Sequence, residues 1–374
     1  KVYDMMAGKL GLGPSTLIDK DETISLIPNV NKNGLRGGVI YHDGQFDDAR
    51  MAISLAMTSN QEGATLINYA NLIGFKKKES LIHGLKIEDV LTGEIFEIFT
   101  KTVVNATGVF SDTVITLDQP NSKPMIRPSQ GVHIVLEKNF LNGPHAIMVP
   151  HTTDGRVLFA VPWNNFVIVG TTDTPIDSAF EEPIALENEI NFILENAGAY
   201  MTKKPCRSDV KSVFAGLRPL AAEKKKNGST KEISRHHKIT VSTSGLISIL
   251  GGKWTTYRKI AEDAVNTVQM VGGFSNRKCN TESLPIFGFD PAADWSNPLH
   301  CYGTEASKIL ALDNNGNKSL SKKFYLTKNQ IYWAIKKEMA ITLEDVLARR
   351  TRSLFLDAYE TELLAPKVAK IMAE

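Results

Sequence analysis

Cysteine is scarce in this sequence, and its few residues form no recognisable pattern. The 374 residues include three cysteines, Cys206, Cys279 and Cys301, which are odd in number and widely spaced. None belongs to a C-x-x-C motif, so the sequence indicates neither a disulfide framework nor a cysteine zinc site. We therefore expect reduced thiols and a cytoplasmic protein.

Long apolar runs and an excess of charge are also missing. No hydrophobic run reaches the roughly 18 residues of a membrane-spanning helix, so any contact with the inner face of the membrane would be peripheral. The 43 Lys and Arg residues nearly balance the 41 Asp and Glu residues, which gives a net charge of +2. This balance does not support nucleic acid as the main partner, and we predict none.

Histidines spaced as zinc ligands are absent as well. His236 and His237 are adjacent, so they lack the i, i+4 spacing of ligands on a helix, and on a strand they would face opposite sides. We therefore predict no metal site.

The remaining composition is that of an ordinary globular protein. With 42% hydrophobic and 22% charged residues over its length, the chain can bury a substantial core in two or three domains. It begins at Lys1 rather than Met, and residues 364–374 carry a helical pattern that stops without a cap. We expect the sequence to be a piece of a longer protein.

Hydrophobic periodicity predicts a mixed α/β protein. The predicted helices cover residues 2–10, 47–63 and 186–201. The predicted strands cover residues 37–40, 65–75, 101–108, 131–136, 157–161, 166–170, 239–242 and 246–250, with a hairpin over 82–98. We interpret the lysine run 76–78 as a solvated turn. Thr327 and Gln330 have the spacing of a capping box at the start of a helical tail, and Thr342 suits a second helix start.

The most informative stretch is the end of the strand 246–250 and the residues after it. A double-glycine turn and a helix start follow the strand, and they include Gly251, Gly252, Lys253, Thr255 and Thr256. Glycine lets a ligand approach the backbone, and a helix N-terminus presents unpaired N–H groups to an anion. Alone, however, such a junction is ordinary in α/β proteins.

Three further residues are candidates for chemistry, each with a plainer alternative. His133 lies on the strand 131–136, where a histidine is more often a core residue than a catalyst. Arg218 stands among apolar residues, and an internal Asp or Glu is a commoner partner for it than a ligand phosphate. Arg235, taken alone, would be a surface cation.

Seven segments, taken in their order along the chain, resemble those of one family. They are 104–108 (VNATG), 130–135 (QGVHIV), 154–163 (DGR through PW), 170–173 (GTTD), 215–220 (AGLRPL), 233–235 (ISR) and 251–258 (GGKWTTYR). This set resembles the FAD-dependent glycerol-3-phosphate dehydrogenases, including the related α-glycerophosphate oxidases. Residues 344–352 resemble their C-terminal helical domain. Short pieces recur in many flavoproteins, but the ordered set is specific.

The resemblance implies an α/β (α+β) fold of the glutathione-reductase/D-amino-acid-oxidase-like type. Residues 1–111 and 246–275 would belong to a Rossmann-like FAD-binding domain. Residues 112–245 would form mainly an antiparallel substrate-domain sheet, and residues 285–374 a C-terminal helical domain.

One part of the family pattern is missing from the sequence. Family members begin with a βαβ unit whose G-x-G-x-x-G loop holds the FAD pyrophosphate. Here Gly8, Gly11 and Gly13 neither follow a strand nor have that spacing. We expect the loop to lie upstream of Lys1, the complete protein to bind FAD, and the chain as it stands to be colourless or nearly so.

The resemblance also implies the reaction and its residues. The reaction is oxidation of sn-glycerol 3-phosphate to dihydroxyacetone phosphate by hydride transfer to FAD, with electrons passed to a quinone or to oxygen. His133 would be the base, Arg218 and Arg235 would clamp the phosphate, and Lys253 would lie at the flavin–substrate junction. The cofactor-binding residues would be Ala106, Thr107, Gly108, Gly251, Gly252, Lys253, Thr255 and Thr256.

Alternatives stay open at this point. The chain could belong to another FAD-dependent amine or hydroxy-acid oxidase, or to a non-catalytic scaffold. Two arginines favour a phosphate over a carboxylate, which typically needs one guanidinium fork. The basic segment 349–352 indicates either interdomain salt bridges or contact with anionic lipid, and a homodimer is also left open.

Overall fold

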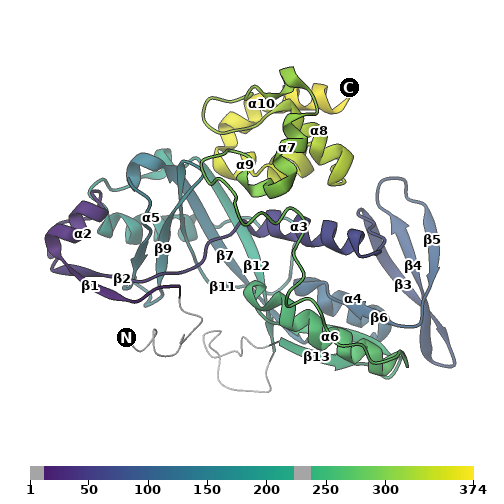
Figure 1. Ribbon diagram of the computed structural model, residues 1–374. Helices are drawn as coiled ribbons and strands as arrows, with labels where there is room; N and C mark the ends of the chain where they lie inside the picture. The colour runs from purple at the N-terminus through teal and green to yellow at the C-terminus, as the bar shows by residue number, and fades with distance from the viewer. Residues whose placement is uncertain (1–11, 223–236) are drawn as a thin grey trace.

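The computed structural model of the protein describes residues 12–222 and 237–374. Within them the strands form four sheets, and Figure 1 shows the C-terminal helices gathered at one end and the three-stranded sheet β3–β5 projecting from one side. The predicted helix over 2–10 lies outside the described residues. None of the described helices is both long enough and apolar enough to cross a membrane.

A six-stranded antiparallel sheet forms the centre of the molecule, as predicted for the substrate-domain region. Its strands are β7 (Ile126–Glu137), β8 (Ile147–Val149), β9 (Leu158–Trp163), β10 (Phe166–Gly170), β11 (Thr174–Pro175) and β12 (Ser212–Ala221). β7 pairs with β10 and β11 on one side and with β12 on the other. His133, near the middle of β7, therefore has a paired neighbour on each of two strands.

The two faces of this sheet pack against different helices. Because side chains alternate along a strand, Val132, Ile134 and Leu136 point together toward α5 (Glu187–Tyr200) and share its apolar cluster. Val135 belongs instead to a cluster with the C-terminal helices. His133 lies between these positions and shares the face of Val135, away from α5.

A second sheet contains the predicted strands on either side of the candidate cofactor residues. β6 (Val103–Asn105) runs parallel to β14 (Leu246–Gly251), which pairs antiparallel with β13 (His237–Val241). After β6 come a 3-10 turn, η2 (Gly108–Phe110), and α4 (Ser111–Asp118). After β14 come η6 (Trp254–Thr256) and α6 (Tyr257–Val271).

The C-terminal part is helical, as predicted. Its elements are η7 (His300–Glu305), α7 (Ala306–Leu310), η8 (Asn314–Asn317), α8 (Lys328–Lys337), the π-helical turn η9 (Asp345–Arg350), α9 (Ser353–Leu356) and α10 (Ala358–Met372). The predicted capping box is confirmed: Thr327 accepts from the backbone N–H of Gln330, and Gln330 accepts from that of Thr327. The second predicted start carries a similar reciprocal pair between Thr342 and Asp345.

The remaining elements lie before and around these parts. They are β1 (Thr16–Asp19), α2 (Lys20–Leu26), β2 (Gly37–Ile40), α3 (Asp48–Gln61), β3 (Ala70–Lys78), β4 (Leu81–Asp89), β5 (Ile95–Phe99), and the 3-10 turns η3 (Lys138–Phe140) and η4 (Arg207–Asp209). The helix predicted over 47–63 and the hairpin over 82–98 are confirmed.

The interpretation of the lysine run 76–78 as a turn was wrong. These residues continue β3, because their side chains find carboxylate partners: Lys76 pairs with Glu97 on β5, and Lys77 with Asp118 at 2.7 Å. The turn comes at Glu79 and Ser80, which both have positive φ.

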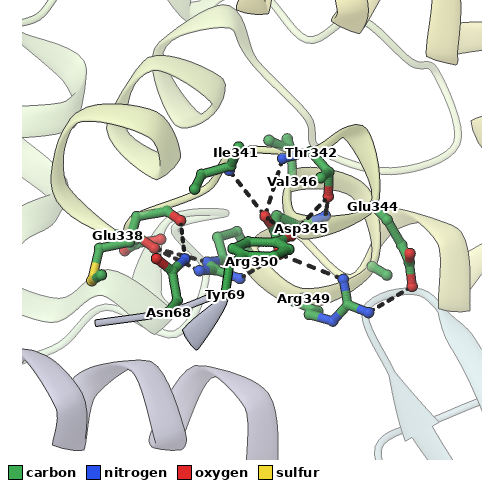
Figure 2. A network of polar contacts seen from close by, with 12 residues as sticks. Asn68, Tyr69, Glu338, Ile341, Thr342, Glu344, Asp345, Val346, Arg349 and Arg350 are labelled. Carbon is green, nitrogen blue, oxygen red and sulfur yellow. Dashed lines mark hydrogen bonds and ion pairs between the residues drawn. The ribbon is translucent and has the colours of Figure 1, made fainter. Parts of the chain in front are cut away.

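A polar network joins the segment between α3 and β3 to the helical part (Figure 2). The buried Asp345 carboxylate accepts hydrogen bonds from the Tyr69 hydroxyl at 2.7 Å and from the backbone N–H of Ile341 at 2.9 Å. Arg350 lies 3.3 Å from the same carboxylate. Despite burial, these donors and Arg350 hold the pKa of Asp345 below its usual range.

Candidate functional site

His133 occupies a slot in the central sheet that its two neighbouring strands shape. On β12 its cross-strand partner Phe214 stacks on the imidazole, with ring centroids 5.3 Å apart and an interplanar angle of 14°. On β10 its partner is Gly170, where an added Cβ would lie 2.2 Å from the imidazole Cδ2. The glycine leaves room for the ring, and the phenylalanine fixes its plane.

The charge state of His133 follows from these surroundings. Burial, and after it the positive charge of Arg218, lower the pKa of His133 to about 4, while Asp48 acts in the opposite direction. The imidazole is therefore neutral at neutral pH. A neutral imidazole can accept a proton, as a general base must.

Arg218 shares the face of His133, one step along the sheet. Arg218 is on β12, opposite Ser129 of β7. Its guanidinium covers Gly131, where a Cβ would lie 2.4 Å from Nη2. Nη2 donates to the Thr171 hydroxyl and to the Thr172 carbonyl, each at 3.1 Å. Gly170 and Gly131 thus leave room on one face of the sheet for His133, the candidate base, and Arg218, the candidate phosphate-binding residue.

The plainer alternative for Arg218 is also present. Its Nη1 lies 3.4 Å from Asp173, an internal carboxylate that also accepts from the Ser129 hydroxyl. The Arg218 side chain nevertheless remains 36% exposed. It is held in place by internal partners and still accessible to a ligand.

The carboxyl ends of the parallel strands β6 and β14 meet at one edge of the second sheet, where ligands of α/β folds characteristically bind. Ala106 and Thr107 are exposed just beyond β6. Buried Asn105 organises this end: its amide donates to Ser248 on β14 and accepts from the Thr107 hydroxyl at 2.7 Å. The small residues beyond β6 are thus fixed beside the glycine turn beyond β14.

The glycine turn itself is built as the sequence indicated. Gly251 and Gly252 both have positive φ, 69° and 91°, and a Cβ on Gly252 would lie 2.7 Å from Ile260 Cδ1. The side chains that follow, Lys253, Thr255 and Thr256, are exposed. Neither η6 nor α6 has a side-chain cap hydrogen bond, and the N–H groups of Thr256 and Tyr257 donate to the carbonyls of Lys253 and Trp254. The N–H groups that would suit a ligand are those at the start of η6.

Two contacts connect the glycine turn with the histidine site. Leu250, just before the turn, packs with Ala221 of β12, three residues beyond Arg218. Trp254, just after it, lies 6.3 Å from Phe46 between ring centroids. Phe46 precedes α3, whose first residue is the Asp48 that acts on His133.

The structure thus brings most of the predicted residues into two neighbouring groups. Arg235 lies outside the described residues, so its place in the site stays a prediction, as do the individual roles of the others. In the described part of the chain, no group of three or more His, Cys, Asp or Glu side chains is placed to hold a metal ion. The three cysteines are free thiols.

Sequence reasoning missed the residues that shape the site from outside its motifs. Asp48 and Phe355 carried no local signal, because both act on His133 through the tertiary fold: Asp48 by its charge, and Phe355 by packing edge to face on Phe214, which stacks on the imidazole. Asp173 lies inside the quoted segment 170–173, and Phe214 lies one residue before the segment 215–220. Their position in or beside the ordered motifs was the available signal, and the cross-strand pairing was needed to interpret it.

The basic segment 349–352 makes ion pairs with segments outside the C-terminal helical part, as the salt-bridge alternative expects. Arg349 lies 3.3 Å from Glu182, in the loop after β11, and 2.7 Å from Glu344. Arg352 lies 3.3 Å from Asp48 and 3.6 Å from Asp47, at the start of α3. These arginines hold the helical part against the sheet and against α3.

Comparison with known proteins places these features in context. The family model described as FAD dependent oxidoreductase matches residues 1–258, and that of the C-terminal domain of alpha-glycerophosphate oxidase matches residues 244–374. The probable mitochondrial glycerol-3-phosphate dehydrogenase of Dictyostelium discoideum is 36% identical over 407 residues, covering 100% of this chain and 64% of that protein. The mitochondrial glycerol-3-phosphate dehydrogenase of Bos taurus is 34% identical over 406 residues, covering 100% and 55%.

A solved structure is also similar. The glycerol-3-phosphate dehydrogenase from Bacillus halodurans complexed with FAD matches with a TM-score of 0.81 and 28% identity, over 96% of this chain and 74% of that one. The chain spans less than two thirds of the length of both curated relatives named above.

Proposed function

We propose, because this chain belongs to the family of FAD-dependent oxidoreductases, that its full-length protein oxidises sn-glycerol 3-phosphate to dihydroxyacetone phosphate. The observation that carries the proposal is the shared sheet face of His133 and Arg218, where Gly170 and Gly131 make room for their side chains. A neutral imidazole beside a guanidinium suits a substrate that has both a hydroxyl proton and a phosphate.

The residues at the carboxyl ends of β6 and β14 fit a flavin. The Gly251–Gly252 turn lets a planar ring approach the backbone, and the uncapped helix start beyond it offers N–H donors. Lys253, Thr255 and Thr256 would add donors from exposed side chains, and Ala106–Gly108 would line the cofactor with small residues. FAD, when bound, supplies the acceptor for the hydride that leaves the substrate C2.

The residues of the chain itself perform the other tasks. Neutral His133 takes the hydroxyl proton as the hydride leaves C2. Arg218 binds the phosphate, and Arg235 is proposed as its second cation. A phosphate dianion would offset the charge of Arg218, which otherwise lowers the pKa of His133. Substrate binding would therefore strengthen the base at the moment it is needed.

The partners beyond the substrate are proposed from the same resemblance. The electrons would pass to a quinone or to oxygen. Peripheral contact with a membrane, a homodimer and a cytoplasmic location remain predictions. Both relatives named above are called mitochondrial, and this location is stated for those proteins rather than for this chain.

Anaerobic rapid mixing of the full-length flavoprotein tests the proposal. Loss of the oxidised-flavin absorbance is expected with sn-glycerol 3-phosphate, and little or none with glycerol, glycine, L-proline or lactate at equal concentration. Faster reduction by an amine or a hydroxy acid would favour another oxidase of the same fold. Flavin binding without reduction by any of these compounds would favour the non-catalytic alternative.

A further inference from the structure

Arg352 connects the C-terminal helical part to the site. It lies at the start of α9 with a positive φ of 60°, and its side chain is 16% exposed. Its guanidinium lies over the Phe355 ring at 4.4 Å from the centroid and over Trp163 of β9 at 5.7 Å. The same group faces Asp48 at 3.3 Å, so a single side chain contacts the sheet, α9 and α3.

An aromatic chain leads from Arg352 to the imidazole. Phe355 meets Phe214 edge to face, with centroids 4.9 Å apart and an angle of 64°. Phe214 in turn stacks on His133. The backbone supports this contact, because the N–H of Ala358 donates to the carbonyl of Lys211, just before β12, at 3.1 Å. Such aromatic and cation–π contacts favour defined ring geometries.

We propose that Arg352 is a positioning residue for His133: by pairing with Asp48 and holding Phe355 against Phe214, it fixes the imidazole ring and shields it from the negative charge on α3. This inference rests on the proposed role of His133 as the base. It adds a residue of the helical part to a site otherwise made from the sheet.

The charged groups around His133 are few. Arg218 on β12 and Asp48 on α3 both act electrostatically on the imidazole. β10 contributes only Gly170 at this position, and the same-face neighbours on β7, Gly131 and Val135, are uncharged. Arg352 acts from the helical part through Asp48 and Phe355.

The sign of the effect follows from these charges. Removing the Arg352 guanidinium leaves the Asp48 carboxylate without its partner, and that carboxylate favours the protonated imidazole. A loosened Phe355 also admits water, which reduces the cost of charging the ring. Both changes raise the pKa of His133 toward its ordinary value.

The test is a titration of the histidine ring signals by NMR in the 374-residue chain, with His133→Asn to assign the resonance among the eight histidines. The titration runs from pH 8 to pH 3, and the wild-type His133 signal should hardly move above pH 5, with its midpoint at about 4. In Arg352→Gln its midpoint should rise by on the order of half to one pH unit. In Arg352→Gln with Asp48→Asn the midpoint should return toward the wild type.

Arg349→Gln is the matched control, because Arg349 makes interdomain ion pairs from the same segment but does not contact Asp48 or the aromatic chain. It should leave the His133 titration unchanged. Where Arg352→Gln loses the fold, Phe355→Leu keeps the ion pairs and should raise the midpoint by a smaller amount. A titration equal to that of the wild type in both variants, or an equal shift in Arg349→Gln, would overturn the proposal.

A kinetic readout in the full-length flavoprotein separates positioning from substrate binding. Arg352→Gln should slow flavin reduction by about 3–10-fold, since a misplaced base costs rate, and should leave KM for glycerol 3-phosphate unchanged. A raised KM with an unchanged rate would contradict a positioning role. The NMR titration involves neither substrate nor flavin, so it decides on Arg352 even where the proposed reaction fails.

Discussion

The two halves of the candidate site are built in opposite ways. In the central sheet, His133 stacks on Phe214 and Arg218 is hydrogen-bonded to Thr171, and glycines on β7 and β10 leave room for both side chains. At the ends of β6 and β14, by contrast, the polar side chains are exposed and the helix starts lack side-chain caps. The described residues of the first half are held by contacts within the chain, whereas the second half presents exposed donors that suit a bound cofactor.

This difference indicates which contacts position the residues of each half. The substrate half depends on neighbouring strands and on the helical part, so its mutations should change rate or folding. The cofactor half depends mainly on backbone N–H groups and exposed side chains, so single substitutions there should have small effects.

The largest effect is expected at His133. In the full-length protein, His133→Asn keeps a polar side chain of similar shape but removes the base. Flavin reduction in a single turnover should slow by about 10²–10⁴-fold, the usual scale for a lost general base. If His133 were only a core residue, the melting temperature would fall instead and reduction would be nearly normal.

A loss of stability is expected where the helical part is attached to α3. Buried Glu338 pairs with Arg50 and accepts from the Trp333 indole at 3.0 Å. Glu338→Gln leaves the Arg50 charge without its partner, which should cost about 3–5 kcal/mol of unfolding free energy in a urea titration. The control is Glu182→Gln: that carboxylate also pairs with an arginine but is 77% exposed, so about 0–1 kcal/mol is expected.

A smaller effect, on substrate binding, is expected at Arg218. Arg218→Ala removes a charge-assisted contact of roughly 1.5–3 kcal/mol, or about 10–150-fold in the binding of glycerol 3-phosphate. The measurement is KM for that substrate and for unphosphorylated glycerol. Equal losses for both would show that Arg218 serves only its internal partner Asp173.

The smallest effect is expected in the cofactor half. Lys253→Met removes one exposed cation near a helix start, a contribution of up to about 1 kcal/mol. The reduction potential of the bound flavin should become more negative by on the order of 20 mV, as measured by dye-coupled titration. A shift several times larger would mean that Lys253 is buried against the flavin. The cofactor half would then be less exposed than the contrast with the substrate half requires.

The sequence carried the features that depend on local pattern. The strands β7, β10 and β14, the hairpin β4–β5 and the capping box at Thr327 all follow from alternation, turn residues and capping chemistry. The ordered motifs predicted the two groups of site residues. Their division into domains remains a prediction.

Contacts between segments that are far apart in the sequence could not be predicted from the sequence alone. The register that sets Gly170 beside His133 joins residues 37 positions apart, and the contact of Asp48 with Arg352 joins residues 304 positions apart. The lysine run 76–78 was misread because its carboxylate partners lie on other elements. Charge alone cannot distinguish a solvated turn from a strand with cross-strand ion pairs.

The most direct test of the central claim, that neutral His133 is the base, is chemical rescue in the full-length flavoprotein. His133→Ala should retain flavin, reduce it slowly with glycerol 3-phosphate, and recover part of its rate when imidazole is added, in proportion to the unprotonated fraction of the imidazole. A folded, flavin-loaded His133→Ala protein that reduces its flavin at nearly the wild-type rate without imidazole would contradict the account.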